Sequence, residues 1–118
     1  MRIVIGGQVE REALADLVRK LGGDRVEVSV KNDIEAAMDV KNGAADYYLG
    51  ACHTGGGGAL AMAIALLGMS TCATLSMPGN IRSEEEIRKE VLAGKKAFGF
   101  TAQHMNQVVP CVLNLILK

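Results

Sequence analysis

Aromatic residues are scarce in this chain of 118 residues, which contains two Phe, two Tyr and no Trp. Platforms that stack the bases of single-stranded nucleic acid are built from aromatic side chains, so they are not expected here. Charge of one sign is not in excess either, because 13 Lys and Arg balance 13 Asp and Glu. A neutral chain without a basic cluster lacks the electrostatic footprint of a nucleic-acid-binding protein. We therefore expect no nucleic-acid partner.

Long hydrophobic runs are also missing. The longest apolar run, Ala59–Met69, is shorter than the roughly 20 residues that cross a bilayer, so no membrane insertion is expected. The amino terminus shows no signal-peptide pattern. The three cysteines, Cys52, Cys72 and Cys111, match neither a zinc-site spacing nor a disulfide framework. These absences favour a cytoplasmic location with reduced thiols, no metal and no cofactor.

Charged residues are absent from two long stretches, 47–81 and 97–117. In a small protein such stretches are buried, either inside the fold or against another subunit. The first contains Ala59–Met69, a helical pattern that is apolar on every side. A helix of this kind is buried all round, and a chain of this length has little material to cover it. We therefore expect a homodimer or larger homo-oligomer that associates through Ala59–Met69.

Short β-type runs alternate with longer helical runs along the chain. Strands are predicted at residues 2–6, 25–30, 46–51, 71–76 and 97–100, and helices at 8–23, 32–43, 59–69, 83–94 and 101–118. Two helices begin with capping-box patterns, Asn32 with Glu35 and Ser83 with Glu86. The alternation predicts one three-layer αβα domain over residues 1–118, with a five-stranded parallel sheet. Its fold class is Rossmann-like or flavodoxin-like, with strand order 2-1-3-4-5.

The loops that follow the strands are the expected ligand-binding region, because open parallel sheets bind ligands beyond the carboxyl ends of their strands. The third strand is followed by Cys-His-Thr and four glycines, and then by the apolar helix. Glycines let backbone N–H groups approach a ligand, and a helix amino terminus favours an anion. We therefore expect a small anionic metabolite, a phosphate or a carboxylate, as partner. The candidate ligand-binding residues are Gly6, Gly7, Gln8, His53, Thr54, Gly55, Gly56, Gly57, Gly58, Asn80 and His104.

The glycines have a second interpretation, a tight turn that lets helix and sheet pack closely.

Cys52 also has two interpretations. A thiol near a helix amino terminus and beside a histidine has a lowered pKa if the geometry holds, which makes Cys52 a candidate nucleophile or proton-transfer group. Neighbouring residues on a strand point to opposite faces, however, and a lone cysteine is usually a small buried hydrophobe.

Two segments of the sequence resemble known families. The segment "IEAAMDVKNGAADYYLGACHTGGGGALAMAIALLG", together with "AFGFTAQHMNQVVP", resembles the YhfU-like family of bacterial domains of unknown function. This resemblance covers nearly the whole chain and implies a bacterial, soluble protein encoded among putative transport and metabolic genes.

The shorter segment "CHTGGGGALA" is similar to the "CGTGxGxSIA" loop of the ribose-5-phosphate isomerase B and galactose-6-phosphate isomerase family. This second resemblance implies an α/β dimer in which Cys52 is the proton-transferring base and Thr54, Gly55 and Gly57 belong to the loop that binds the sugar phosphate. His53 stands where that family has glycine, and "GGQVERE" stands where it has Asp-His.

Three functions therefore remain open: a small module that binds an anionic metabolite at the glycine loop, a Cys52-dependent sugar-phosphate isomerase, and an accessory or regulatory partner of a transport system.

Overall fold

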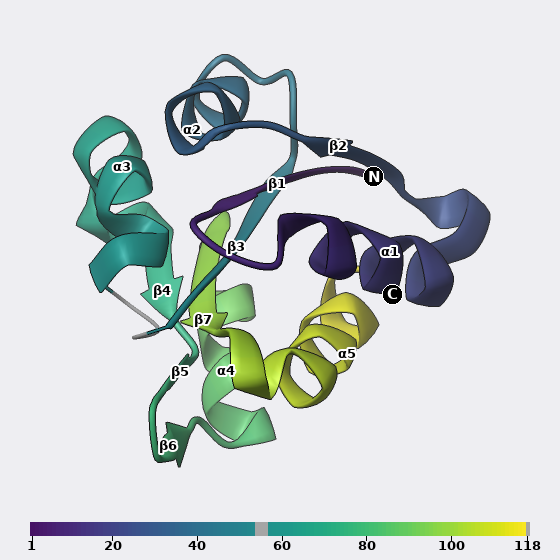
Figure 1. Ribbon diagram of the computed structural model, residues 1–118, viewed down its shortest axis with the longest axis vertical. Helices are drawn as coiled ribbons and strands as arrows, with labels where there is room; N and C mark the ends of the chain where they lie inside the picture. The colour runs from purple at the N-terminus through teal and green to yellow at the C-terminus, as the bar shows by residue number, and fades with distance from the viewer. Residues whose placement is uncertain (54–56, 118) are drawn as a thin grey trace.

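The architecture is a parallel β-sheet covered by helices on both faces, seen in a computed structural model that describes residues 1–53 and 57–117 (Figure 1). The sheet strands are β1 (Arg2–Gly7), β2 (Glu27–Val30), β3 (Tyr47–Cys52), β4 (Cys72–Thr74) and β7 (Ala97–Thr101). The helices are α1 (Arg11–Gly22), α2 (Asp33–Lys41), α3 (Gly57–Leu67), α4 (Glu84–Leu92) and α5 (Met105–Ile116). Short elements join them: β5 (Ser76–Met77), β6 (Asn80–Ile81), η1 (Gly23–Arg25), η2 (Met69–Thr71) and η3 (Ala102–His104).

The two predicted capping patterns both begin a helix. Ser83 and Glu86 form a complete capping box at the start of α4. Asn32 caps α2 by accepting a hydrogen bond from the Glu35 backbone N–H, while its amide donates to the Glu35 carboxylate. At the other end of the chain, α5 continues through Pro110 without a break.

The strands pair in the order β2-β1-β3-β7-β4, and all four pairings are parallel. Counted along the chain this order is 2-1-3-5-4, so the fold class is confirmed but the predicted order 2-1-3-4-5 is wrong in its last two strands. β4 has only three residues and forms the edge, whereas all five residues of β7 are buried between β3 and β4. Both strands are uncharged, so the sequence pattern did not distinguish the central strand from the edge strand.

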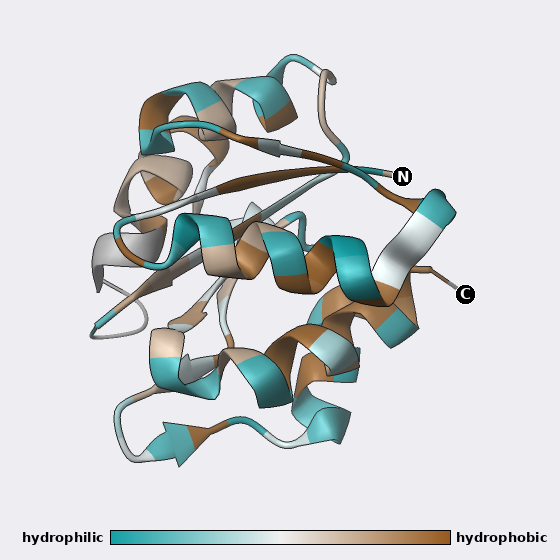
Figure 2. Cartoon of the chain, turned by 45° about the vertical axis from the view of Figure 1, so that its right-hand side comes forward, coloured by the Kyte–Doolittle hydropathy of each residue, from teal (hydrophilic) through white to brown (hydrophobic). Residues whose placement is uncertain are grey.

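Two apolar clusters lie on opposite faces of the sheet. One contains buried residues of α1, α4 and α5, among them Leu14, Ile87 and Val109. The other contains buried residues of α2 and α3, such as Ala37 and Leu60. Figure 2 shows α1 with alternating teal and brown bands, as expected for a helix with one buried side. We refer to the two faces as the α1/α5 face and the α2/α3 face.

Within the described residues, no helix is long and apolar enough to cross a membrane.

Candidate functional site

β1 and β3 are adjacent parallel strands whose chains leave the sheet in opposite directions. β1 leads to α1, which packs on the α1/α5 face, and β3 leads to α3, which packs on the α2/α3 face. Divergence of this kind opens a crevice at the carboxyl edge, where open α/β sheets bind ligands. The candidate site is therefore built from the ends of β1 and β3 and from their neighbours, β2 and β7.

The turn after β1 is held by hydrogen bonds to β3. The backbone N–H groups of Gln8 and Val9 both donate to the Ala51 carbonyl, at 2.9 and 3.3 Å. Gly7 has a φ of +83°, and a Cβ added there would lie 2.5 Å from the Ala51 nitrogen. Only glycine fits this position, because a larger residue meets backbone rather than a side chain that can move.

A buried polar group lies beneath this turn. The Tyr48 hydroxyl donates to Asp33 Oδ1 at 3.0 Å and accepts from the Gly7 N–H at 3.1 Å, and the same N–H donates to Asp33 Oδ1. Tyr48 is fully buried. Burial raises the pKa of Tyr48 well above its usual value, and the neighbouring Asp33 carboxylate raises it further. The Gly7 N–H, a predicted ligand donor, is thus bonded within the protein.

Glycines on neighbouring strands make room for the Tyr48 ring. A Cβ on Gly6 would lie 2.6 Å from the ring, and a Cβ on Gly50 would lie 2.8 Å from the hydroxyl oxygen. Gly6 pairs with Gly50, and Gly50 pairs with Gly99 of β7. We call these three residues the glycine row, since they form a strip without side chains across β1, β3 and β7. Isolated glycines in strands often mark such close approaches.

Cys52 and Thr101 are register partners at the ends of β3 and β7, and both are buried. Side chains alternate along a strand, so Cys52 lies on the same face as Tyr48, and Thr101 on the same face as Ala97. Tyr48 and Ala97 both belong to the cluster on the α2/α3 face. Cys52 and Thr101 therefore lie together on that face, where α3 begins at Gly57.

The Thr101 hydroxyl is buried and has no hydrogen-bond partner among the residues that the structure describes. Its backbone N–H donates to the Ser76 hydroxyl at 3.0 Å, and Ser76 is itself 2% exposed. The end of β7 is thus fixed through its backbone, while the Thr101 side-chain oxygen has no partner among the described residues.

His53 lies on the other face of the sheet. It is exposed and lines a cavity of about 490 Å³ with residues of α1, η3 and α5, including Leu17, Gln103 and Asn106. His53 thus follows β3 and faces α1 and α5, whereas Cys52, the last residue of β3, lies on the α2/α3 face by the alternation of side chains along the strand.

The remaining predicted site residues are spread around the edge. Gly57 and Gly58 are the first two residues of α3, and Thr54, Gly55 and Gly56 lie outside the described residues. Gln8 is exposed, and Asn80 lies in the exposed β6 strand of the β5–β6 hairpin. His104 ends η3, and its Nδ1 is buried without a partner in the described part of the chain.

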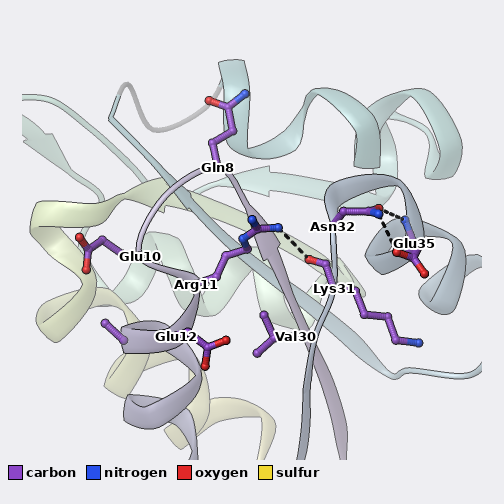
Figure 3. Close-up of a pocket in the computed structure, with 9 residues that line it drawn as sticks. Gln8, Glu10, Arg11, Glu12, Val30, Lys31, Asn32 and Glu35 are labelled. Carbon is purple, nitrogen blue, oxygen red and sulfur yellow. Dashed lines mark hydrogen bonds between the residues drawn. The ribbon is translucent and has the colours of Figure 1, made fainter.

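A second cavity, of about 660 Å³, lies between the starts of α1 and α2 (Figure 3). Arg11 crosses it and donates to the Lys31 carbonyl at 3.4 Å, while the Lys31 ammonium pairs with Asp39 at 2.6 Å. Its lining includes three carboxylates, those of Glu10, Glu12 and Glu35. The mixed charge makes this cavity a poor match for a small anion. In Figure 3 the Gln8 side chain points away from the other labelled side chains.

Tyr48, Gly50 and Gly99 belong to this edge but were not predicted from the sequence, whereas Asp33 and Thr101 lie just after the second and fifth predicted strands without being among the candidate ligand-binding residues. The isolated glycines in the third and fifth sheet strands were a usable signal, because such glycines indicate a close approach. Tyr48 carried no such signal, since its position depends on strand pairing. Within the described residues, no group of three or more His, Cys, Asp or Glu side chains is arranged to hold a metal ion.

Comparison with a solved structure supports the fold class. The crystal structure of ribose-5-phosphate isomerase B RpiB from Giardia lamblia matches with a TM-score of 0.70. The match covers 100% of this chain and 94% of that chain, at 16% sequence identity. At this identity the match shows a shared fold and no more.

Comparison with sequences identifies the family. The proteins named "Uncharacterized protein YhfU" in Escherichia coli (strain K12) and Shigella flexneri are each 40% identical to this chain over 106 residues. The matches cover 90% of this chain and 91% of each relative. The family model described as "Protein of unknown function DUF2620" matches residues 1–116. The resemblance to YhfU-like proteins is thereby confirmed, and the chain belongs to the DUF2620 family of proteins of unknown function.

Proposed function

We propose that this protein binds a small anionic metabolite on the α2/α3 face of the carboxyl edge, between the ends of β3 and β7 and the start of α3. The observation that supports the proposal is the divergence of the chain after β1 and β3, because open α/β sheets bind ligands at the carboxyl ends of strands beside such a point.

Charge favours the α3 side of the crevice for an anion. The first turns of α1, α2 and α4 contain acidic residues, but those of α3 and α5 contain none. The positive end of the α3 dipole is therefore not neutralised by a carboxylate of its own first turn. On the β1 side, the Asp33 carboxylate accepts the Gly7 N–H and repels a second negative group.

A sugar phosphate is the first ligand to try. The matching solved structure is named as a ribose-5-phosphate isomerase, and its fold extends over the whole of this chain. A phosphate group at the amino end of α3 combines backbone N–H donors with the helix dipole, so it does not require a neighbouring lysine or arginine.

The binding test is thermal unfolding with ribose 5-phosphate, inorganic phosphate or a dicarboxylate, and with ribose as the uncharged control. A saturating ligand at about one hundred times its Kd stabilises the folded protein by about 2.7 kcal/mol, so the Tm rises by several degrees. No increase with any of the anions would contradict the proposal.

Two matched variants locate the anion on α3. Ala61 and Ala65 are both exposed on this helix, but Ala61 lies nearer its amino end. Ala61→Glu places a negative charge close to the proposed anion and is expected to reduce the Tm increase. Ala65→Glu adds the same charge farther away and is expected to leave most of the increase in place. Equal effects of the two variants would place the anion elsewhere.

A Cys52-dependent isomerase is the second candidate, favoured by the position of Cys52 at the end of β3 on the proposed ligand face. In this mechanism Cys52 removes a proton from the carbon next to the sugar carbonyl and returns it to the former carbonyl carbon, while the hydroxyl proton on the first carbon passes to the carbonyl oxygen. Cys52→Ser separates the two functions, because binding survives the change and isomerisation of ribose 5-phosphate does not. Equal turnover by the wild type and by Cys52→Ser would exclude Cys52 as the base.

We also propose that α3 mediates self-association. Met62, Ile64, Leu66 and Leu67 are only partly buried in one chain, and Met69 just beyond the helix is 75% exposed. A second copy would remove this apolar surface from water. Light scattering is expected to give a dimer or larger species, and Ile64→Glu is expected to shift it towards the monomer. A monomeric wild type at high concentration would contradict this proposal.

A further inference from the structure

We infer that Thr101 contacts the bound anion, donating its hydroxyl to a phosphate or carboxylate oxygen beside Cys52. The inference rests on the proposed function and adds Thr101, at the end of β7, to the candidate ligand-binding residues predicted from the sequence.

The first argument is the unused hydroxyl. Thr101 is 1% exposed, and its Oγ1 has no hydrogen-bond partner among residues 1–53 and 57–117. A buried hydroxyl without a partner loses its bonds to water and gains nothing in exchange, so such groups are rare in folded proteins. An exception of this kind calls for an explanation, and a ligand that accepts the hydrogen bond provides one.

The second argument is the position of the hydroxyl. Thr101 pairs with Cys52 across the β3–β7 boundary, and both lie on the face against which α3 packs. The preceding pair on this face is Gly50 with Gly99, which belongs to the glycine row and has no side chains. The Thr101 oxygen therefore lies at the carboxyl edge, on the face where the helix dipole of α3 favours an anion.

The third argument is the fixed backbone around Thr101. The Thr101 N–H donates to the Ser76 hydroxyl at 3.0 Å, and the Leu75 N–H donates to the Gly99 carbonyl at 2.8 Å. The end of β7 is thus bonded through its backbone to the segment that follows β4. A hydroxyl on such a rigid strand end is positioned before the ligand arrives, which lowers the cost of ordering on binding.

Thr101→Val tests the hydroxyl with little change in shape, because valine replaces the oxygen with a methyl group and keeps the branched side chain. Thr101→Ser is the reciprocal variant, which keeps the hydroxyl. Thr74→Val is the matched control, since Thr74 is a partly buried residue of β4 that pairs with Gly99. The Tm of each variant is measured without ligand, and each variant is then titrated with ribose 5-phosphate and with inorganic phosphate.

The expected result has two parts. Without ligand, Thr101→Val melts at the wild-type temperature or above, because it removes an unpartnered polar group. With ligand, it binds about tenfold or more weakly than the wild type, whereas Thr101→Ser and Thr74→Val stay within about threefold.

Two results would overturn the inference about Thr101 without contradicting the proposed function. A clearly lower Tm of ligand-free Thr101→Val would mean that the hydroxyl already has a partner inside the protein. Undiminished binding by Thr101→Val, with the wild type binding normally, would mean that the ligand does not use it. If the wild type bound none of the anions, the proposed function would fail, and the inference with it.

Discussion

At the β1 end of the crevice, the backbone N–H groups of Gly7, Gln8 and Val9 are all hydrogen-bonded within the protein. At the β7 end, the buried Thr101 hydroxyl has no partner in the described part of the chain. Both ends follow buried parallel strands, and both belong to one carboxyl edge. Under the proposed function, this difference corresponds to a division of roles, in which the β1 turn fixes the shape of the edge and the β3–β7 end receives the anion.

The largest loss of stability is expected from adding a side chain at Gly7 in the turn after β1. Gly7→Ala places a Cβ 2.5 Å from a backbone nitrogen at a φ of +83°. Strain and overlap together should lower the free energy of unfolding by about 3 kcal/mol or more, measured by urea denaturation.

Gly43→Ala is the control for the change at Gly7. Gly43 has a similar φ of +79°, but an added Cβ there meets nothing within 4 Å. Its cost is the backbone strain alone, about 1 to 2 kcal/mol. Equal losses of stability in the two variants would show that the contact of Gly7 with β3 is unimportant.

The next largest loss of stability is expected from removing the Tyr48 hydroxyl. Tyr48→Phe removes the hydrogen bond that the Tyr48 hydroxyl donates to Asp33 and the one that it accepts from the Gly7 N–H. The free energy of unfolding should fall by about 1 to 3 kcal/mol near neutral pH. Tyr47→Phe is the control, because Tyr47 is partly exposed and stacks on Phe98 through its ring. A loss in Tyr48→Phe no larger than in the control would contradict a structural role for this group.

Tyr48 also predicts a pH dependence. Its pKa is raised in the folded protein above the ordinary value of 10.0, so the unfolded chain releases this proton first. The stabilisation is complete below about pH 10 and is lost as the pH rises further. Unfolding measured from about pH 8 to about pH 11 should show a steeper alkaline loss in the wild type than in Tyr48→Phe. Parallel curves would mean that Tyr48 ionises equally in both states.

The smallest loss of stability is expected at the opposite edge of the sheet, where the strands β1 and β3 begin. The Asp46 carboxylate accepts the Arg2 backbone N–H at 2.7 Å and pairs with its guanidinium at 3.2 Å. The bond from the Arg2 N–H is the main reason that the pKa of Asp46 is lowered, so its stabilisation is lost as the pH falls through the folded pKa. Asp46→Asn should cost below about 1 kcal/mol at pH 7, because the pair is exposed. It should leave anion binding unchanged, and weaker binding would show that the two edges are coupled.

Local patterns in the sequence predicted much of the fold and part of the candidate site. The alternation of strands and helices is visible in periodicity, and the caps at Asn32 and Ser83 depend on residues within one turn. The general location of the site also followed, because every loop after a parallel strand lies at the same edge.

Features that depend on tertiary pairing were not predicted. The position of β7 between β3 and β4 could not be predicted because β4 and β7 are both short, uncharged strands. The register of Thr101 with Cys52 and the space that Gly6 and Gly50 leave for the Tyr48 ring both depend on strand pairing. Periodicity indicates which residues are buried, but it does not indicate which strand lies beside which.

The most direct test of the comparison is a titration with ribose 5-phosphate and with inorganic phosphate, followed by the backbone amide resonances of the protein. The account predicts that the largest shifts occur at Cys52, Gly57 and Thr101, with small shifts at Gly7 and Gln8. Shifts concentrated at Gly7–Arg11 and Lys31–Glu35 would place the ligand in the cavity between α1 and α2 and contradict the account.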